Sequence, residues 1–187
     1  MFNIEKTTQI AAYLLWKSKG DIACVKLMNM MYLAEKTFLL RYGECMIGDK
    51  LVSMPHGPGL SAVYDLFLGN NEYWKYWINN PGKYQLALAP QIRVDDSEPL
   101  NTFDELSVAD TKILDSVLQK IGEMSRQQIF DFIQQNCPEW EDPHGSPTQI
   151  SFKDLLLKNG KSEEEVTLIL QNIEEIEDLH SVAQGIV

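Results

Sequence analysis

The three histidines are the first side chains to test for metal or acid–base chemistry. His56, His144 and His180 lie far apart in a chain of 187 residues. None of them forms the H-x-x-x-H pair that places two imidazoles on one face of a helix. A zinc or iron site would have to be assembled from unrelated segments. The sequence therefore predicts no metal site.

Residues 54–59, Met-Pro-His-Gly-Pro-Gly, form the segment that could cradle a phosphate group. The segment lacks the Lys-Ser/Thr pair of a Walker loop, and no long buried strand precedes it. Proline fixes its own backbone torsion, and Pro58 suits the first turn of a helix that runs to about Leu68. We expect a rigid turn followed by a helix, and no nucleotide cofactor.

Three carboxylates, Glu35, Asp65 and Asp131, fall inside predicted helices, where each could act as a general acid or base. An N-cap, an ion pair or a solvated helix face explains each of them with fewer assumptions. No nucleophile with a base and an orienting group accompanies them. We expect no catalytic residue, no cofactor and no enzymatic activity.

Cysteine content and hydropathy indicate the compartment. Cys24, Cys45 and Cys137 are odd in number and widely spaced, which fits neither a disulfide framework nor a CxxC metal site. No stretch approaches the roughly 18 apolar residues that a membrane span needs, and the first residues are not a basic signal-peptide start. We expect reduced, mostly buried thiols in a cytoplasmic protein.

Charge is divided unevenly along the chain. The net charge is −11; residues 1–100 hold ten basic and ten acidic side chains, whereas residues 101–187 hold six and seventeen. An acidic surface repels a phosphate backbone. The aromatic run at residues 73–77 could stack bases, but Lys75 is its only close cation. We expect no direct nucleic-acid binding.

The spacing of apolar residues predicts a mainly α fold: one compact helical domain over residues 1–187, with a small central β-hairpin or short strands. Within it, residues 1–94 form a charge-neutral half and residues 101–187 an acidic helical half. Helices are predicted over 6–16, from 21 to Gly43, from Pro58 to Leu68, and after the caps Ser107, Ser125, Ser151 and Ser162. Residues 44–54 are expected to form a short hairpin or an extended loop around Gly48-Asp49, and short strands are expected at 83–88 and 91–94.

Short blocks spread along the chain occur in an order that is typical of one family. They are Lys26-Leu27-Met28, Tyr32-Leu33-Ala34-Glu35-Lys36, Arg41-Tyr42-Gly43, Met54-Pro55-His56-Gly57-Pro58, Ser61-Ala62-Val63-Tyr64-Asp65-Leu66, Leu106-Ser107, Ile113-Leu114-Asp115, Met124-Ser125, Pro138-Glu139-Trp140 and Ile150-Ser151. In sequence and spacing these blocks resemble the Panacea domain, also called the SocA-like antitoxin domain, over nearly the whole chain.

The resemblance implies a bacterial or phage antitoxin of a type II toxin–antitoxin system. Such a domain neutralises a cognate toxin protein, commonly encoded by the adjacent gene, by direct contact, either as a homodimer or within a toxin–antitoxin heterotetramer. We expect the turn and the helix after it to bind the partner, together with the tryptophan of the later block. The expected partner-binding residues are Met54, Pro55, His56, Gly57, Pro58, Ser61, Tyr64, Asp65 and Trp140.

Two positions depart from the family pattern. The family usually has an aromatic residue where this chain has His56, and a Thr-His pair where this chain has Gln135-Asn136. If these positions contact the partner, the departures change which partner is bound. The acidic half suits a basic toxin, because complementary charge accelerates encounter.

One alternative function is a proteolytic adaptor that delivers a partner protein to an AAA+ protease, with residues 183–187 as a flexible tail. A further alternative is a metal-dependent enzyme, which stoichiometric metal in the purified protein would support.

Overall fold

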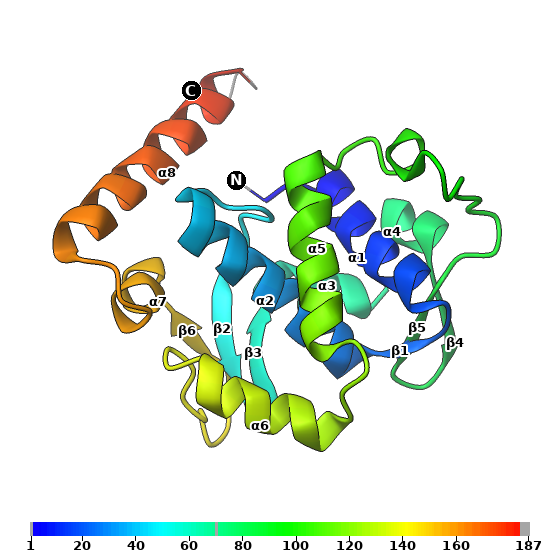
Figure 1. Cartoon of the computed structure of the whole chain (residues 1–187), viewed down its shortest axis with the longest axis horizontal. Coiled ribbons are helices and arrows are strands. Elements are labelled where there is room, and N and C mark those ends of the chain that lie inside the picture. The colour runs from blue at the N-terminus through cyan, green and yellow to red at the C-terminus, as the bar shows by residue number, and fades with distance from the viewer. Residues whose placement is uncertain (1, 70, 184–187) are drawn as a thin grey trace.

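The centre of the molecule is a helix that is buried on all sides. In the computed structural model, which describes residues 2–69 and 71–183, this helix is α2 (Cys24–Tyr42), and every residue from 27 to 36 is buried. A helix with apolar residues all round is typical of a core position. It packs against α1 (Ile4–Ser18) and α5 (Val108–Ile121), which lie beside it (Figure 1).

Two antiparallel sheets of three strands flank this helical centre. The first has the order β1-β5-β4 and consists of β1 (Ile22–Ala23), β5 (Gln85–Leu88) and β4 (Ile78–Gly82). The second has the order β3-β2-β6 and consists of β3 (Gly57–Leu60), β2 (Leu51–Met54) and β6 (Thr148–Ile150). Because β6 comes from the acidic half of the chain, the second sheet joins the two halves.

Five further helices and one 3-10 turn complete the described part of the structure. They are α3 (Ser61–Phe67), α4 (Glu72–Trp77), a 3-10 turn (Pro99–Asn101), α6 (Arg126–Asn136), α7 (Phe152–Lys158) and α8 (Glu163–Ala183). α8 packs on α7 and then leads away from the other helices at the edge of the molecule (Figure 1). Its Ile169 side chain lies over Gly43, which ends α2 in the left-handed conformation (φ 70°).

The mainly α prediction is confirmed, and so are the four predicted helix starts. Ser107 and Ser125 form capping boxes with Asp110 and Gln128, and the same reciprocal bonds join Ser162 to Glu165. Ser151 accepts a hydrogen bond from the Asp154 main chain. These signals are local in sequence, so they can be recognised without knowledge of the tertiary contacts.

Of the two alternatives predicted around Gly48-Asp49, the structure has the loop, and the hairpin is wrong. The strand that begins at Leu51 pairs forward instead, with Leu51 opposite Leu60 and Met54 opposite Gly57, and Pro55-His56 forms the turn. Pro58 therefore lies in β3 and not in a helix, and α3 begins only at Ser61. A proline is tolerated there because β3 is an edge strand.

Two other β predictions are corrected or refined. Residues 91–94 form no strand, because Ala89 to Ile92 close a turn through the hydrogen bond from Ile92 N to Ala89 O. The strand predicted at 83–88 is present as β5, and its partner is β4, which directly follows the aromatic helix α4. The helix predicted from residue 21 begins at Cys24, after the two residues of β1.

Candidate partner-binding site

A groove with a volume of about 510 Å³ opens beside the β2–β3 hairpin. This lies within the range of about 300–1,000 Å³ that is typical of ligand pockets. The lining comes from the start of α2, the hairpin, α3 and one residue before β6: Cys24, Val25, Met28, Asn29, Val52, Met54, Pro55, His56, Gly57, Ser61, Tyr64, Asp65, Phe67 and Pro147. Seven of the nine residues predicted to bind a partner line this groove: Met54, Pro55, His56, Gly57, Ser61, Tyr64 and Asp65.

The hairpin presents its side chains to the groove by strand alternation. Leu51 and Ser53 are buried, whereas Val52 and Met54 are half-buried and line the groove. The Met54 side chain lies across Gly59, where a Cβ atom would collide with the methionine Cε. Gly57 has a φ of 123°, which L side chains rarely adopt. The two glycines therefore let the hairpin turn tightly against α2.

The other two predicted residues support the hairpin from outside the groove lining. Pro58 is buried in β3. Trp140 donates a hydrogen bond from Nε1 to the Met54 carbonyl at 3.1 Å, and its ring lies edge-on to Phe130 at 5.8 Å. Trp140 therefore fixes the strand end from which the groove residues project.

Asp49 fixes α3 relative to the hairpin. The N-cap residue of α3, Leu60, makes no side-chain hydrogen bond to the helix. Instead, the buried Asp49 carboxylate accepts hydrogen bonds from the main-chain N–H groups of Ala62 and Val63, both at 3.0 Å. A carboxylate also stabilises the positive end of a helix. The two hydrogen bonds from Ala62 and Val63 to Asp49 hold α3 in place, and with it Tyr64 and Asp65 at the groove. The sequence gives no signal of this role, because Asp49 lies thirteen residues before Ala62 and its pairing with Gly48 is typical of a turn.

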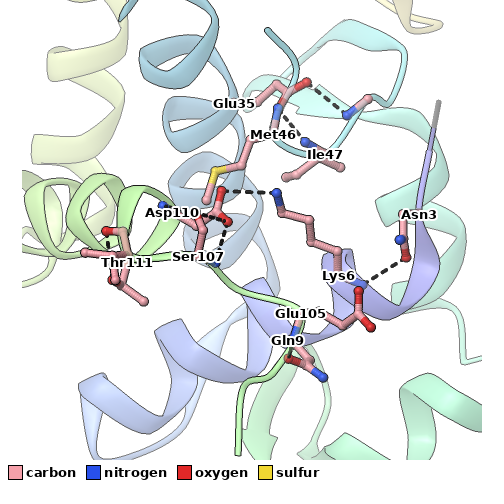
Figure 2. Close-up of polar contacts among 12 residues, drawn as sticks. Asn3, Lys6, Gln9, Glu35, Met46, Ile47, Glu105, Ser107, Asp110 and Thr111 are labelled. Carbon is pink, nitrogen blue, oxygen red and sulfur yellow. Dashed lines mark hydrogen bonds and ion pairs between the residues drawn. The ribbon is translucent and has the colours of Figure 1, made fainter. Parts of the chain in front are cut away.

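Glu35 has a structural role rather than a catalytic one. Its fully buried carboxylate accepts hydrogen bonds from the main chain of Met46 (2.8 Å), Ile47 (2.7 Å) and Gly48 (3.1 Å) (Figure 2). Burial raises the pKa of Glu35, and the three N–H donors act in the opposite direction. Glu35 thereby shapes the loop between α2 and β2.

The other two candidate carboxylates are exposed. Asp65 lies at the groove with no hydrogen bond or ion pair to its side chain within the described residues, and Asp131 accepts a hydrogen bond from Gln127 at 2.9 Å.

A buried ion pair joins α2 to the segment after α6. Lys36 Nζ lies 2.9 Å from both carboxylate oxygens of Glu139 and donates to the Asn136 carbonyl at 2.7 Å. Glu139 also accepts hydrogen bonds from Tyr32 at 2.8 Å and from Asn159, on α7's C-terminal side, at 2.9 Å. Burial and the nearby Glu139 carboxylate raise the pKa of Tyr32 well above its ordinary value. Every oxygen and proton in this cluster has a partner, as a buried ion pair requires.

Neither the cysteines nor the acidic residues assemble a metal site in the part of the chain that the structure describes. Cys24, Cys45 and Cys137 are free, and burial raises the pKa of Cys137 to about 12. No three His, Cys, Asp or Glu side chains within residues 2–69 and 71–183 come together to hold a metal ion. In the same residues, no helix has both the length and the apolar character to cross a membrane.

The fold and the site define a mainly helical domain with two small antiparallel sheets and an open, mostly apolar groove. More particularly, the chain belongs to the antitoxin SocA-like, Panacea domain family, whose model matches residues 27–141. The match runs from α2 to the residue after Trp140, so it includes nearly the whole groove and the Lys36–Glu139 pair. It is shorter than the whole-chain extent that the sequence blocks indicate. No curated protein and no solved structure gives a significant match.

Proposed function

We propose that this chain is the antitoxin of a type II toxin–antitoxin system and that it neutralises a cognate protein toxin by direct contact. The observation that carries the proposal is the family match over residues 27–141. We place the interaction in the cytoplasm, where the three free cysteines stay reduced.

The proposed toxin-binding surface is the groove together with the residues that support it, Pro58 and Trp140. Polar groups at the groove support this assignment. The side chains of His56, Ser61, Tyr64 and Asp65 make no hydrogen bond or ion pair within the described residues. Tyr64 is also an exposed aromatic residue, a type enriched at the energetic centres of interfaces. The surface is therefore rich in groups that a partner can satisfy.

We also propose that residues 1–187 act as one domain, with residues 1–94 as the neutral part and residues 101–187 as the acidic part. Two contacts between the neutral and the acidic part support a single domain. Leu51 pairs with Ile150 across β2 and β6, and Lys36 pairs with Glu139.

Co-expression in a bacterial host tests the proposal. The product of the adjacent gene is induced alone and together with this chain. We expect growth arrest with the first and recovery with the second. A neighbouring product that is harmless alone, or that remains lethal beside well-expressed antitoxin, contradicts the proposed function.

His56→Ala is expected to weaken toxin binding about fivefold or more, because His56 is exposed at the groove and bonds to nothing in the free chain. The melting temperature should stay close to that of the wild type, since an exposed substitution of this kind seldom changes stability. Titration calorimetry and thermal unfolding measure the two effects. Equal loss of affinity and stability would assign His56 to the architecture of the turn instead.

The acidic end of α8 is expected to accelerate association with a basic toxin. Glu174, Glu175, Glu177 and Asp178 are exposed and lie too far from the helix N-terminus to act on its dipole. Changing all four to their amides should lower the association rate and flatten its salt dependence, with little change in the dissociation rate. Stopped-flow measurements at two ionic strengths test this. A quadruple variant that associates as fast as the wild type at low salt removes the steering role.

The adaptor alternative relies on the tail at residues 183–187, of which residues 184–187 lie outside the described part of the chain.

A further inference from the structure

A buried amide without a partner lines the groove. Asn29 lies on α2 among apolar residues, and only 3% of its surface is exposed. Its side chain makes no hydrogen bond within the described residues, although it lies close to the hairpin: a Cβ atom on Gly57 would be 2.9 Å from Asn29 Oδ1. The amide atoms of Asn29 are not among the fully enclosed unpaired atoms of the described residues, so they are open to the groove. The Asn29 carboxamide therefore has donor and acceptor capacity that is left for a ligand in the groove.

The surroundings of Asn29 favour an apolar ligand. The wall around the carboxamide consists of the side chains Val25, Met28, Val52, Met54, Phe67 and Pro147. The groove carries one permanent charge, that of the exposed Asp65, and the chain as a whole has a net charge of −11. A ligand that fits this groove combines apolar groups with a positive charge.

The carboxamide also indicates the conformation of the ligand. A side-chain amide has the same donor and acceptor pattern as a peptide group. An extended segment leaves its peptide N–H and C=O groups free, whereas a helix uses them internally. The free edge of β3 is not the place for strand addition, because Leu60 N already donates to Met28 Sδ at 3.3 Å. We therefore expect Asn29, and not the edge of β3, to bind the main chain of the ligand.

We propose that the groove binds an extended, apolar segment of the toxin in which a Lys or Arg stands beside the buried apolar residues. Asn29 bonds to one peptide group of this segment, and Asp65 pairs with its cation. This inference rests on the proposed function, because it names the part of the toxin that the antitoxin binds.

The test uses the full-length chain and a displayed library of random dodecapeptides as the probe. Selection should enrich sequences in which apolar residues adjoin Lys or Arg. Addition of the strongest peptide should shift the side-chain NH₂ resonances of Asn29 in an amide NMR spectrum. A merely structural Asn29 would give no such shift.

Three groove variants and two controls locate the peptide. Asn29→Leu should weaken peptide binding about tenfold, the loss expected when a buried peptide group goes unpaired, and should leave the melting temperature unchanged. Val52→Trp should fill the groove and abolish binding. Leu68→Trp is the matched control, because Leu68 is 62% exposed, lies just after α3 and is not part of the groove lining. Asp65→Lys should weaken the binding of basic peptides, whereas Asp96→Lys, at an exposed aspartate outside the groove, should leave it unchanged.

Three results would overturn the inference: no enrichment of peptides, peptides that bind Asn29→Leu and Val52→Trp as well as the wild type, or enriched peptides that are bound as helices. The growth assay separates the two proposals. If the wild type and both groove variants rescue growth equally, the groove inference fails while the antitoxin function stands. If the wild type itself gives no rescue, the proposed function fails.

Discussion

Replacing Glu139 with leucine is expected to lower the free energy of unfolding by about 3–5 kcal/mol. The change leaves the Lys36 ammonium buried with no counter-ion, since the side chain of Lys36 is 7% exposed and its remaining acceptor is the Asn136 carbonyl. It also removes the acceptor for Tyr32 and one of the two acceptors for Asn159, which still donates to the Leu155 carbonyl. Urea denaturation followed by circular dichroism measures the loss.

A neighbouring ion pair supplies the control. Glu141 lies 2.8 Å from Lys158, but its side chain is 80% exposed, and surface ion pairs contribute little. Glu141→Leu should leave the unfolding midpoint nearly unchanged. The double variant Lys36→Met with Glu139→Leu should recover part of the lost stability, because no isolated charge remains. A Glu139→Leu protein as stable as the wild type would show that the Lys36 ammonium is solvated in solution.

Glu35→Leu is expected to be the second severe substitution, with a loss of about 3 kcal/mol or more. The main-chain N–H groups of Met46, Ile47 and Gly48 lose their acceptor, and a buried donor left unpaired costs about 1–3 kcal/mol. Hydrogen exchange at these three amides should accelerate. Glu35→Gln keeps one acceptor oxygen, so its free energy of unfolding should lie between those of the wild type and Glu35→Leu. Glu44→Leu, on the exposed side of the same loop, is the control and should change neither quantity.

Glu35 also gives the stability a pH dependence of known sign. Because burial raises the pKa of Glu35 above its ordinary value of 4.5, the folded chain binds this proton more tightly than the unfolded chain. The contribution of Glu35 is therefore complete below pH 4.5 and decreases as the pH rises through the folded-state pKa. The stability difference between the wild type and Glu35→Gln should be larger at pH 4.5 than at pH 7. A difference that increases with pH would contradict this assignment.

The sequence predicted those features that depend on neighbours along the chain. Helix caps such as Ser107 and Ser125 satisfy their own helix within three residues, so they could be identified without tertiary information. The residues of the turn and of α3 line one groove because they are close in sequence as well as in space. Because of this adjacency, half of the residues that line the groove are already candidates in the sequence.

Features that depend on distant partners could not be predicted. β6 has three residues and is stabilised by pairing with β2, about a hundred positions earlier. The pairing partner of Lys36 is likewise remote. Asn29 was missed although it carries a signal, a single amide between Met28 and Met30 in an apolar helix. The role of Asn29 could not be predicted because it depends on the hairpin, whose turn places Gly57 against the Asn29 side chain.

The pairing of β6 with β2 has a consequence for the boundaries of any shortened protein. The family model ends at residue 141, before β6. A chain cut at that point would leave the main-chain N–H and C=O groups of β2 open along Leu51 to Ser53. Such an exposed strand edge templates pairing with other copies and leads to aggregation. Residues 142–150 thus cover the β2 edge of the second sheet through β6, and a soluble fragment must include them.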